Sequence, residues 1–122
     1  MTTTSKKTIL LLDNDEDWLT LLGRLMAADG YRVLTATTCA AAILLSERDR
    51  PDCVVADLNL DGESGMMLCR HVKSSPDLKS VPVILLSGLE PVRPVGGCPW
   101  DAFVCKADGT ARLLLAIKKL LA

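Results

Sequence analysis

Five short apolar runs, most of them separated by segments of helical periodicity, constrain this chain more than any other feature of its sequence. The runs cover residues 8–12, 31–36, 53–57, 82–86 and 102–105. Between most of them, apolar residues recur at the three- and four-residue spacing of an amphipathic helix. Strands joined by helices pair in parallel, because a parallel crossover needs a long connection. The pattern therefore predicts an α/β fold built on a parallel sheet of five strands.

Four helices and one irregular connection are expected between and after these strands. The helices are predicted from the acidic residues 15–17 to Gly30, from Thr38 to about Arg48, from Ser64 as N-cap to 75–77, and from about Gly109 to Leu121. Residues 88–102 hold three prolines and three glycines instead. An interior proline costs a helix roughly 3 kcal/mol and a glycine roughly 1. The fourth helix of the alternation is therefore expected to be degraded or missing.

The composition fits one domain with an aliphatic core. The chain has 122 residues, of which 49% are hydrophobic and 3% aromatic, and its net charge is −1. This balance gives no basic stripe for nucleic acid. With no signal peptide and no long apolar run, we expect a cytoplasmic protein without membrane contact, whose five cysteines are reduced. Residues 1–7 are expected to be a disordered tail and residues 8–122 the domain.

Polar side chains stand at the carboxyl ends of four predicted strands. They are Asp13 after the first run, Asp57 at the end of the third, Ser87 after the fourth and Lys106 after the fifth. The carboxyl ends of parallel strands meet at one edge of the sheet, where open α/β sheets bind their ligands. Two carboxylates, a hydroxyl and an ammonium group are therefore expected to converge on one site.

The expected site has the composition of a phosphoryl-transfer centre that uses Mg²⁺. Asp13, Asp57 and the backbone carbonyl of Asn59 would form an all-oxygen site of the kind that Mg²⁺ prefers. Lys106 and the Ser87 hydroxyl would balance the charge of a phosphoryl group. Asp57 would itself act as the nucleophile and form an acyl phosphate.

Four ordered segments make the chain resemble a response-regulator receiver domain, and the resemblance extends from Thr8 to Leu121. They are ILLLDND at residues 9–15, PDCVVADLNLDGESG at residues 51–65, VPVILLSG at residues 81–88 and FVCK at residues 103–106. The resemblance implies a flavodoxin-like, doubly wound (βα)5 fold whose sheet has the strand order 2-1-3-4-5. It also implies that residues 8–122 form one receiver domain.

For function, the resemblance implies a module of two-component signalling rather than an enzyme. A histidine kinase or a histidine phosphotransfer protein would phosphorylate Asp57, with Mg²⁺ bound. Ser87 would move toward the phosphoryl group while Phe103, at the switch-aromatic position, turns inward. This coupling would bias a two-state surface that meets a downstream protein, an effector domain or a second copy of the chain.

Several residues depart from the family pattern. The acidic pair expected after the first strand is here Asp13-Asn14. The amide of Asn14 can still ligate Mg²⁺, but it lacks the charge, so metal affinity should fall. Ala107 replaces the usual proline after the lysine, and a cis bond is not favoured there. Leu89 is apolar where the family is often polar, and we hypothesise that it screens the acyl phosphate from water.

The irregular segment 88–102 leaves two interpretations of signalling open. Either the domain signals through another surface, such as its first and last helices, or it is a pseudo-receiver that binds proteins without being phosphorylated. Trp100 is expected to anchor this segment over the sheet, and Trp18 to pack in the core or at the rim of the site. A small α/β phosphatase is a third interpretation, but position 59 carries Asn where a general-acid Asp would stand.

Overall fold

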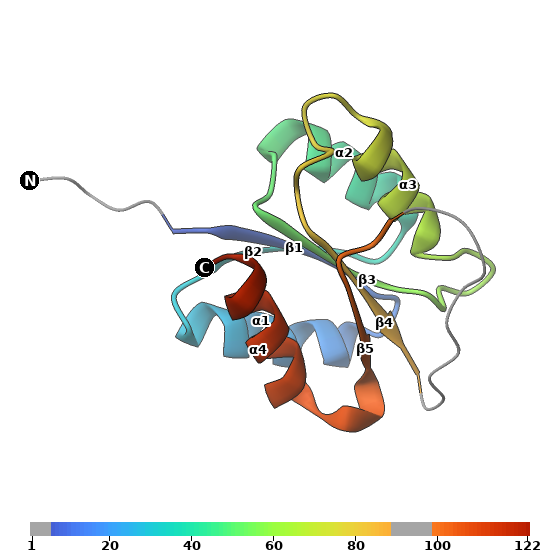
Figure 1. The fold of residues 1–122 in the computed structure, drawn as a ribbon. Coiled ribbons are helices and arrows are strands. Elements are labelled where there is room, and N and C mark those ends of the chain that lie inside the picture. The colour runs from blue at the N-terminus through green and yellow to red at the C-terminus, as the bar shows by residue number, and fades with distance from the viewer. Residues whose placement is uncertain (1–5, 89–98) are drawn as a thin grey trace, which may run out of the picture.

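Five strands form one parallel sheet in the computed structural model, which describes residues 6–88 and 99–122. The sheet has the order β2-β1-β3-β4-β5 (Figure 1). Its strands are β1 (Thr8–Leu12), β2 (Arg32–Ala36), β3 (Cys53–Asp57), β4 (Val83–Ser87) and β5 (Ala102–Cys105). The predicted α/β class, the flavodoxin-like topology and the strand order are therefore confirmed.

The helices lie on both faces of this sheet. They are α1 (Glu16–Ala28), α2 (Cys39–Asp49), α3 (Met66–Ser74), α4 (Thr110–Leu120) and the short 3-10 helix η1 (Lys106–Asp108). Helices α2 and α3 cover one face, and α1 and α4 cover the other (Figure 1). Residues 1–5 and 89–98 lie outside the described residues, and with them the predictions for the start of the tail, for Leu89 and for a fourth helix that is degraded or missing.

The two faces of the sheet bury alternate residues of its inner strands. On β1, Leu10 and Leu12 pack with α2 and α3, while Ile9 and Leu11 pack with α1 and α4. All five residues of β1, β3 and β4 are buried. Each fully buried aliphatic side chain contributes roughly 1.5–3 kcal/mol relative to exposure. The central strands are therefore a rigid platform for the residues at their ends.

The helix starts follow from local capping, with one exception. The Asp15 carboxylate accepts the backbone N–H groups of residues 17 and 18 at the start of α1, and the Thr38 hydroxyl accepts that of residue 41 in α2. Helix α3 begins at Met66 with Gly65 in the N-cap place, one residue after the predicted Ser64, although the Ser64 Oγ does accept the backbone N–H of Met66 at 3.2 Å. The Gly65 N–H donates to the carbonyl of Asp57, which fixes the turn before the helix begins.

The structure bears on the expected reduced state of the cysteines and on the expected absence of a membrane span. Cys39, Cys53 and Cys105 are buried free thiols, as expected. Cys69 of α3 is disulfide-bonded, so the expectation that every thiol is reduced is wrong for this residue. None of the helices in the described part of the chain has the length and apolar character needed to cross a membrane.

Candidate functional site

Two carboxylates lie side by side at the carboxyl edge of the central strands. Asp13 directly follows β1, and Asp57 is the last residue of β3. Leu12 and Ala56 are register partners in the parallel β1–β3 pair, so the next residue of each strand reaches the same edge. The exposed fractions are 1% for Asp13 and 4% for Asp57. Two buried acids in contact require a cation or a proton.

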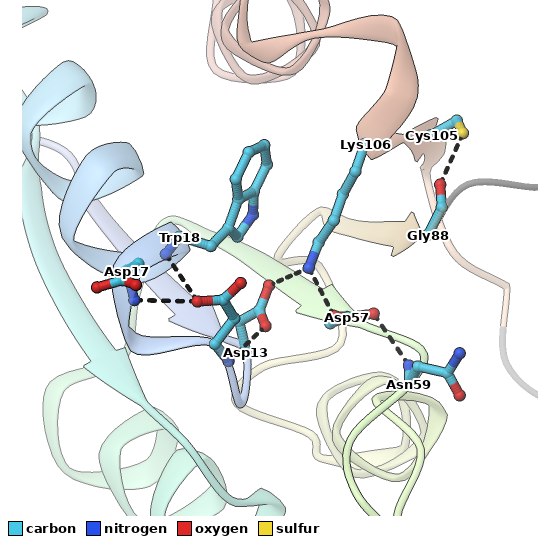
Figure 2. Close-up of polar contacts among 9 residues, drawn as sticks. Asp13, Asp17, Trp18, Asp57, Asn59, Gly88, Cys105 and Lys106 are labelled. Atoms are coloured by element: carbon cyan, nitrogen blue, oxygen red, sulfur yellow. Dashed lines mark hydrogen bonds and ion pairs between the residues drawn. The ribbon is translucent and has the colours of Figure 1, made fainter.

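Lys106, at the start of η1, supplies that cation. Its Nζ lies 2.6 Å from Asp13 Oδ2 and 2.8 Å from Asp57 Oδ2 (Figure 2). Burial by itself lowers the pKa of Lys106, but the hydrogen bonds and charges of the two aspartates outweigh burial and raise it above the ordinary 10.5. The ammonium is therefore charged at neutral pH and joins the ends of β1, β3 and β5.

Asp13 is held in a less favourable environment. Burial raises the pKa of Asp13, and the negative charge of Asp57 adds to this effect. The bond to Lys106 and the backbone N–H of Asp15, which donates to Asp13 Oδ1 at 2.9 Å, lower the pKa only in part. The pKa of Asp13 stays above its ordinary value of 3.8, so this carboxylate would be stabilised by further positive charge.

Asp57 is fixed by the loop that follows it. The backbone N–H of Asn59 donates to Asp57 Oδ1 at 2.9 Å, and the N–H of Gly65 donates to the Asp57 carbonyl at 3.0 Å. A Cβ at residue 65 would collide with that carbonyl oxygen and lie 2.9 Å from its carbon. Only glycine permits this close approach. Gly65 belongs to the quoted segment 51–65, but its role depends on a tertiary contact that the sequence does not display.

Ser87 and Phe103 occupy the neighbouring strands β4 and β5. Ser87 ends β4 with 5% of its surface exposed, and its Oγ has no hydrogen-bond partner among the described residues. Phe103 is half-buried on β5 and packs against the core beneath α2 and α3. Its ring centroid is 6.3 Å from that of Trp100, which packs against the same core. Ser87 and Phe103 thus lie on neighbouring strands two register positions apart, since Phe103 pairs with Leu85 and Ser87 with Cys105.

The predicted metal ligands come together only in part. Asp13 and Asp57 meet at Lys106, whereas the side chain of Asn14 is exposed on the loop after β1. Asn59, whose backbone carbonyl is the predicted ligand, stays close to Asp57 and donates its N–H to Asp57 Oδ1. Asp15 caps α1 with its carboxylate, so it does not replace the missing acid. No group of three or more His, Cys, Asp or Glu side chains gathers as a metal cluster within residues 6–88 and 99–122. Two carboxylates with neutral oxygens nearby still fit Mg²⁺, which prefers oxygen and retains water.

Trp18 contacts Lys106 at this site, and this contact was not predicted from the sequence. It lies in the first turn of α1, and Lys106 Nζ is 5.2 Å from the centroid of its ring (Figure 2). Its expected packing at the core and rim is confirmed, because it is half-buried against the cluster under α1 and α4. Its contact with a residue 88 positions later has no local signal.

Comparison with known proteins gives the same family along most of the chain. The response regulator receiver domain family matches residues 9–95. Response regulator PleD of Caulobacter vibrioides is 33% identical over 82 residues, which make up 67% of this chain and 18% of PleD. The polar-differentiation response regulator DivK of Brucella anthropi is 26% identical over 121 residues, with 94% of this chain and 96% of DivK covered. The chain thus spans less than a fifth of PleD and nearly all of DivK.

Solved structures share the fold. Chemotaxis protein CheY4 of Vibrio cholerae superposes with a TM-score of 0.83 at 20% identity, covering 96% of this chain and 100% of that one. The receiver domain of an HD domain-containing protein from Pseudomonas fluorescens gives 0.84 at 24% identity, covering 99% and 90%. At these identities the structures speak for the fold alone. The family match over residues 9–95 decides the assignment: the chain belongs to the response regulator receiver domain family.

Proposed function

We propose that this domain accepts a phosphoryl group on Asp57 from a histidine kinase or a histidine phosphotransfer protein and thereby switches a protein-interaction surface. The observation that carries the proposal is the buried Asp57 carboxylate, which shares one ammonium, that of Lys106, with Asp13. A reactive carboxylate at a strand end, beside a fixed cation, is the arrangement that phosphoryl transfer requires. Family membership supports the same choice of donor.

In the proposed transfer, an oxygen of Asp57 forms a bond to phosphorus while the phosphorus–nitrogen bond of the donor phosphohistidine breaks. The electron pair of the broken bond remains on the imidazole nitrogen. Lys106 already lies 2.8 Å from Asp57 Oδ2, so its ammonium can balance the charge of the phosphoryl oxygens. The backbone N–H of Asn59 keeps the other carboxylate oxygen in place. The chain therefore aligns the nucleophile and the cation before the donor arrives.

Mg²⁺, which this reaction is proposed to need, would be held by Asp13 and Asp57, with the backbone carbonyl of Asn59 and the amide of Asn14 as neutral ligands. When bound, it would offset negative charge on the phosphoryl oxygens. The buried carboxylates of Asp13 and Asp57 share the single ammonium of Lys106, and this supports a second cation at the site.

The proposed switch uses Ser87 and Phe103. The Ser87 hydroxyl is buried without a partner among the described residues, so a phosphoryl oxygen would provide the acceptor that it lacks. Movement of β4 toward the phosphoryl group would make room beside Phe103, which is only half-buried. The positions of Ser87 and Phe103 would then determine which of two conformations the surface at β4 and β5 adopts. A cytoplasmic location, a downstream protein and a homodimer belong to this proposal.

Incubation with acetyl phosphate and Mg²⁺, followed by intact-mass measurement, tests the proposal. The wild-type protein should gain one phosphoryl group, and Asp57→Ala should gain none. Asp77→Ala, which removes an exposed acid near the end of α3, should behave like the wild type. A wild type that gains nothing with Mg²⁺ present would favour the pseudo-receiver. The Asp57–Lys106–Asp13 contacts speak against that alternative.

A further inference from the structure

The indole of Trp18 covers the lysine of the candidate site. Lys106 Nζ lies 5.2 Å from the ring centroid, within the range of a cation–π contact. The backbone N–H of Trp18 donates to the capping carboxylate Asp15 at 3.2 Å. The cap thus fixes the backbone of the first turn of α1, from which the ring extends. Figure 2 shows the indole standing beside Lys106 above Asp13.

Lys106 is consequently held by three groups from different elements. Asp13 and Asp57 bind its ammonium, and the Trp18 ring lies on a further side, leaving 21% of the lysine side chain exposed. A lysine has four rotatable bonds, and a free one loses conformational entropy when it is fixed. Because the indole already restricts the Lys106 side chain, less of its conformational entropy remains to be lost during the reaction.

The indole itself is held by its ring face. Trp18 packs against the apolar cluster under α1 and α4, and its Nε1 is buried without a hydrogen-bond partner among the described residues. The polar atom therefore does not explain the ring's position. Apolar packing on the side of the core and the ammonium on the side of the site are the contacts that remain.

We infer that Trp18 is a positioning residue for phosphoryl transfer, keeping the Lys106 ammonium at the shared edge of Asp13 and Asp57 and shielding it from water. The inference rests on the proposed function, because its catalytic consequence requires Asp57 to accept a phosphoryl group. Trp18 does not touch the reacting atoms. It acts through the lysine, and its loss should leave the carboxylates where they are.

Two substitutions of Trp18 distinguish the effect of its aromatic face from that of its apolar volume. Trp18→Phe keeps an aromatic face, whereas Trp18→Leu keeps only apolar packing. In the protein without a phosphoryl group, NMR should show the Lys106 Cε protons shifted upfield by the indole ring current. The shift should vanish in Trp18→Leu and persist in reduced form in Trp18→Phe. Leu21→Ala, an exposed position on the same helix, should leave the shift unchanged.

The rate of phosphorylation by acetyl phosphate and Mg²⁺ gives the second measurement. Trp18→Leu should slow it roughly five- to thirtyfold, the factor expected for one cation–π contact, and Trp18→Phe should slow it less. In a Lys106→Met background, where the cation is absent, Trp18→Leu should cause no further loss. Should Trp18→Leu fold poorly, Trp18→Met replaces it with a longer, unbranched apolar side chain.

The outcomes distinguish this inference from the proposed function. A Trp18→Leu protein that retains the Lys106 shift, or slows equally with and without Lys106, overturns the positioning role. A wild type that accepts no phosphoryl group overturns the proposed function, and with it the catalytic part of the inference. The Lys106 shifts decide the contact in either case, because they are measured before any phosphoryl group is added.

Discussion

The two carboxylates stabilise the charged form of Lys106 more than burial destabilises it. The stability of the fold should therefore fall at alkaline pH, where this ammonium loses its proton. Its pKa in the folded protein lies above the ordinary 10.5. The stabilisation is therefore fully present below pH 10.5 and is lost as the pH rises through the folded pKa. We expect the free energy of unfolding of the wild type to fall more steeply above that pH than that of Lys106→Met.

Urea unfolding in metal-free buffer between about pH 9 and pH 12 measures this difference. Tyr31 and Cys53 also carry raised pKa values and titrate in the same range, but they are present in both proteins. The difference between the two curves therefore isolates Lys106. Parallel curves would show that the ammonium gains nothing from its contacts with the two aspartates.

Gly65 governs the position of the proposed acceptor through its missing side chain. Gly65→Ala places a Cβ against the Asp57 carbonyl, which must move by displacing backbone. We expect a loss of about 2–4 kcal/mol in the free energy of unfolding, typical of severe overpacking, together with slower phosphorylation. Chemical denaturation and the acetyl phosphate assay measure the two effects.

Gly23→Ala is the matched control for that change. Gly23 lies inside α1, and an added Cβ would meet only Val33 Cγ1 at an ordinary 3.9 Å. Alanine is the better helix former, so this variant should be stabilised by about 0.5–1 kcal/mol. Equal effects of the two substitutions would refute a specific clash at residue 65.

Asn14 sets the charge of the proposed metal site. Asn14→Asp restores a third carboxylate beside Asp13 and Asp57, and it should tighten Mg²⁺ binding about tenfold, equivalent to about 1.4 kcal/mol. Asn14→Ser adds no charge and should bind Mg²⁺ no more tightly than the wild type. Isothermal titration with MgCl₂ compares the three proteins. An Asn14→Asp protein with wild-type affinity would place the ion away from this loop.

At the scale of elements, one ion pair ties the end of α3 to the starts of β4 and β5. Asp101 Oδ2 accepts from the backbone N–H of Val83 at 2.7 Å and from Lys73 Nζ at 2.8 Å. Lys73 also donates to the carbonyl of Val81 at 2.9 Å. These bonds join three elements at the edge of the sheet opposite the candidate site, directly before β5.

Asp101→Ala should therefore destabilise the fold by about 1–3 kcal/mol, because it leaves the Val83 N–H and the Lys73 ammonium without this acceptor. Asp77→Ala is the contrasting case. The Arg50–Asp77 pair spans 3.5 Å and both side chains are 67% exposed, so its removal should cost no more than about 0.5 kcal/mol. Thermal unfolding of both variants measures the contrast. Equal losses would mean that the Asp101 bonds do not join these elements.

For the whole molecule, the periodicity of the sequence predicts the strands and their parallel arrangement. The strands at 8–12, 53–57 and 102–105 have the predicted bounds, β4 begins and ends one residue later than predicted, and β2 begins one residue later. Parallel topology then brought Asp13, Asp57 and Lys106 together, because strand ends share one edge. The side chain of Asn14 remains at the surface, since loop geometry rather than strand order decides its direction.

Contacts between distant segments could not be predicted in the same way. The approach of Gly65 to Asp57 and the ring of Trp18 over Lys106 both depend on how a helix is set against the sheet. Neither has a periodic signal. The start of the third helix combines a local and a distant contact: the Ser64 Oγ accepts the backbone N–H of Met66 at 3.2 Å, as the local sequence favours, whereas the bond from the Gly65 N–H to β3 has no local signal.

Mapping the phosphorylated residue is the sharpest test of whether Asp57 is the acceptor. Protein treated with acetyl phosphate and Mg²⁺ is reduced with borohydride, which converts an aspartyl phosphate into homoserine, and its peptides are sequenced by mass spectrometry. Homoserine is expected at Asp57 and at no other acid, Asp13 included. Homoserine at another residue, with Asp57 unmodified, would contradict this expectation.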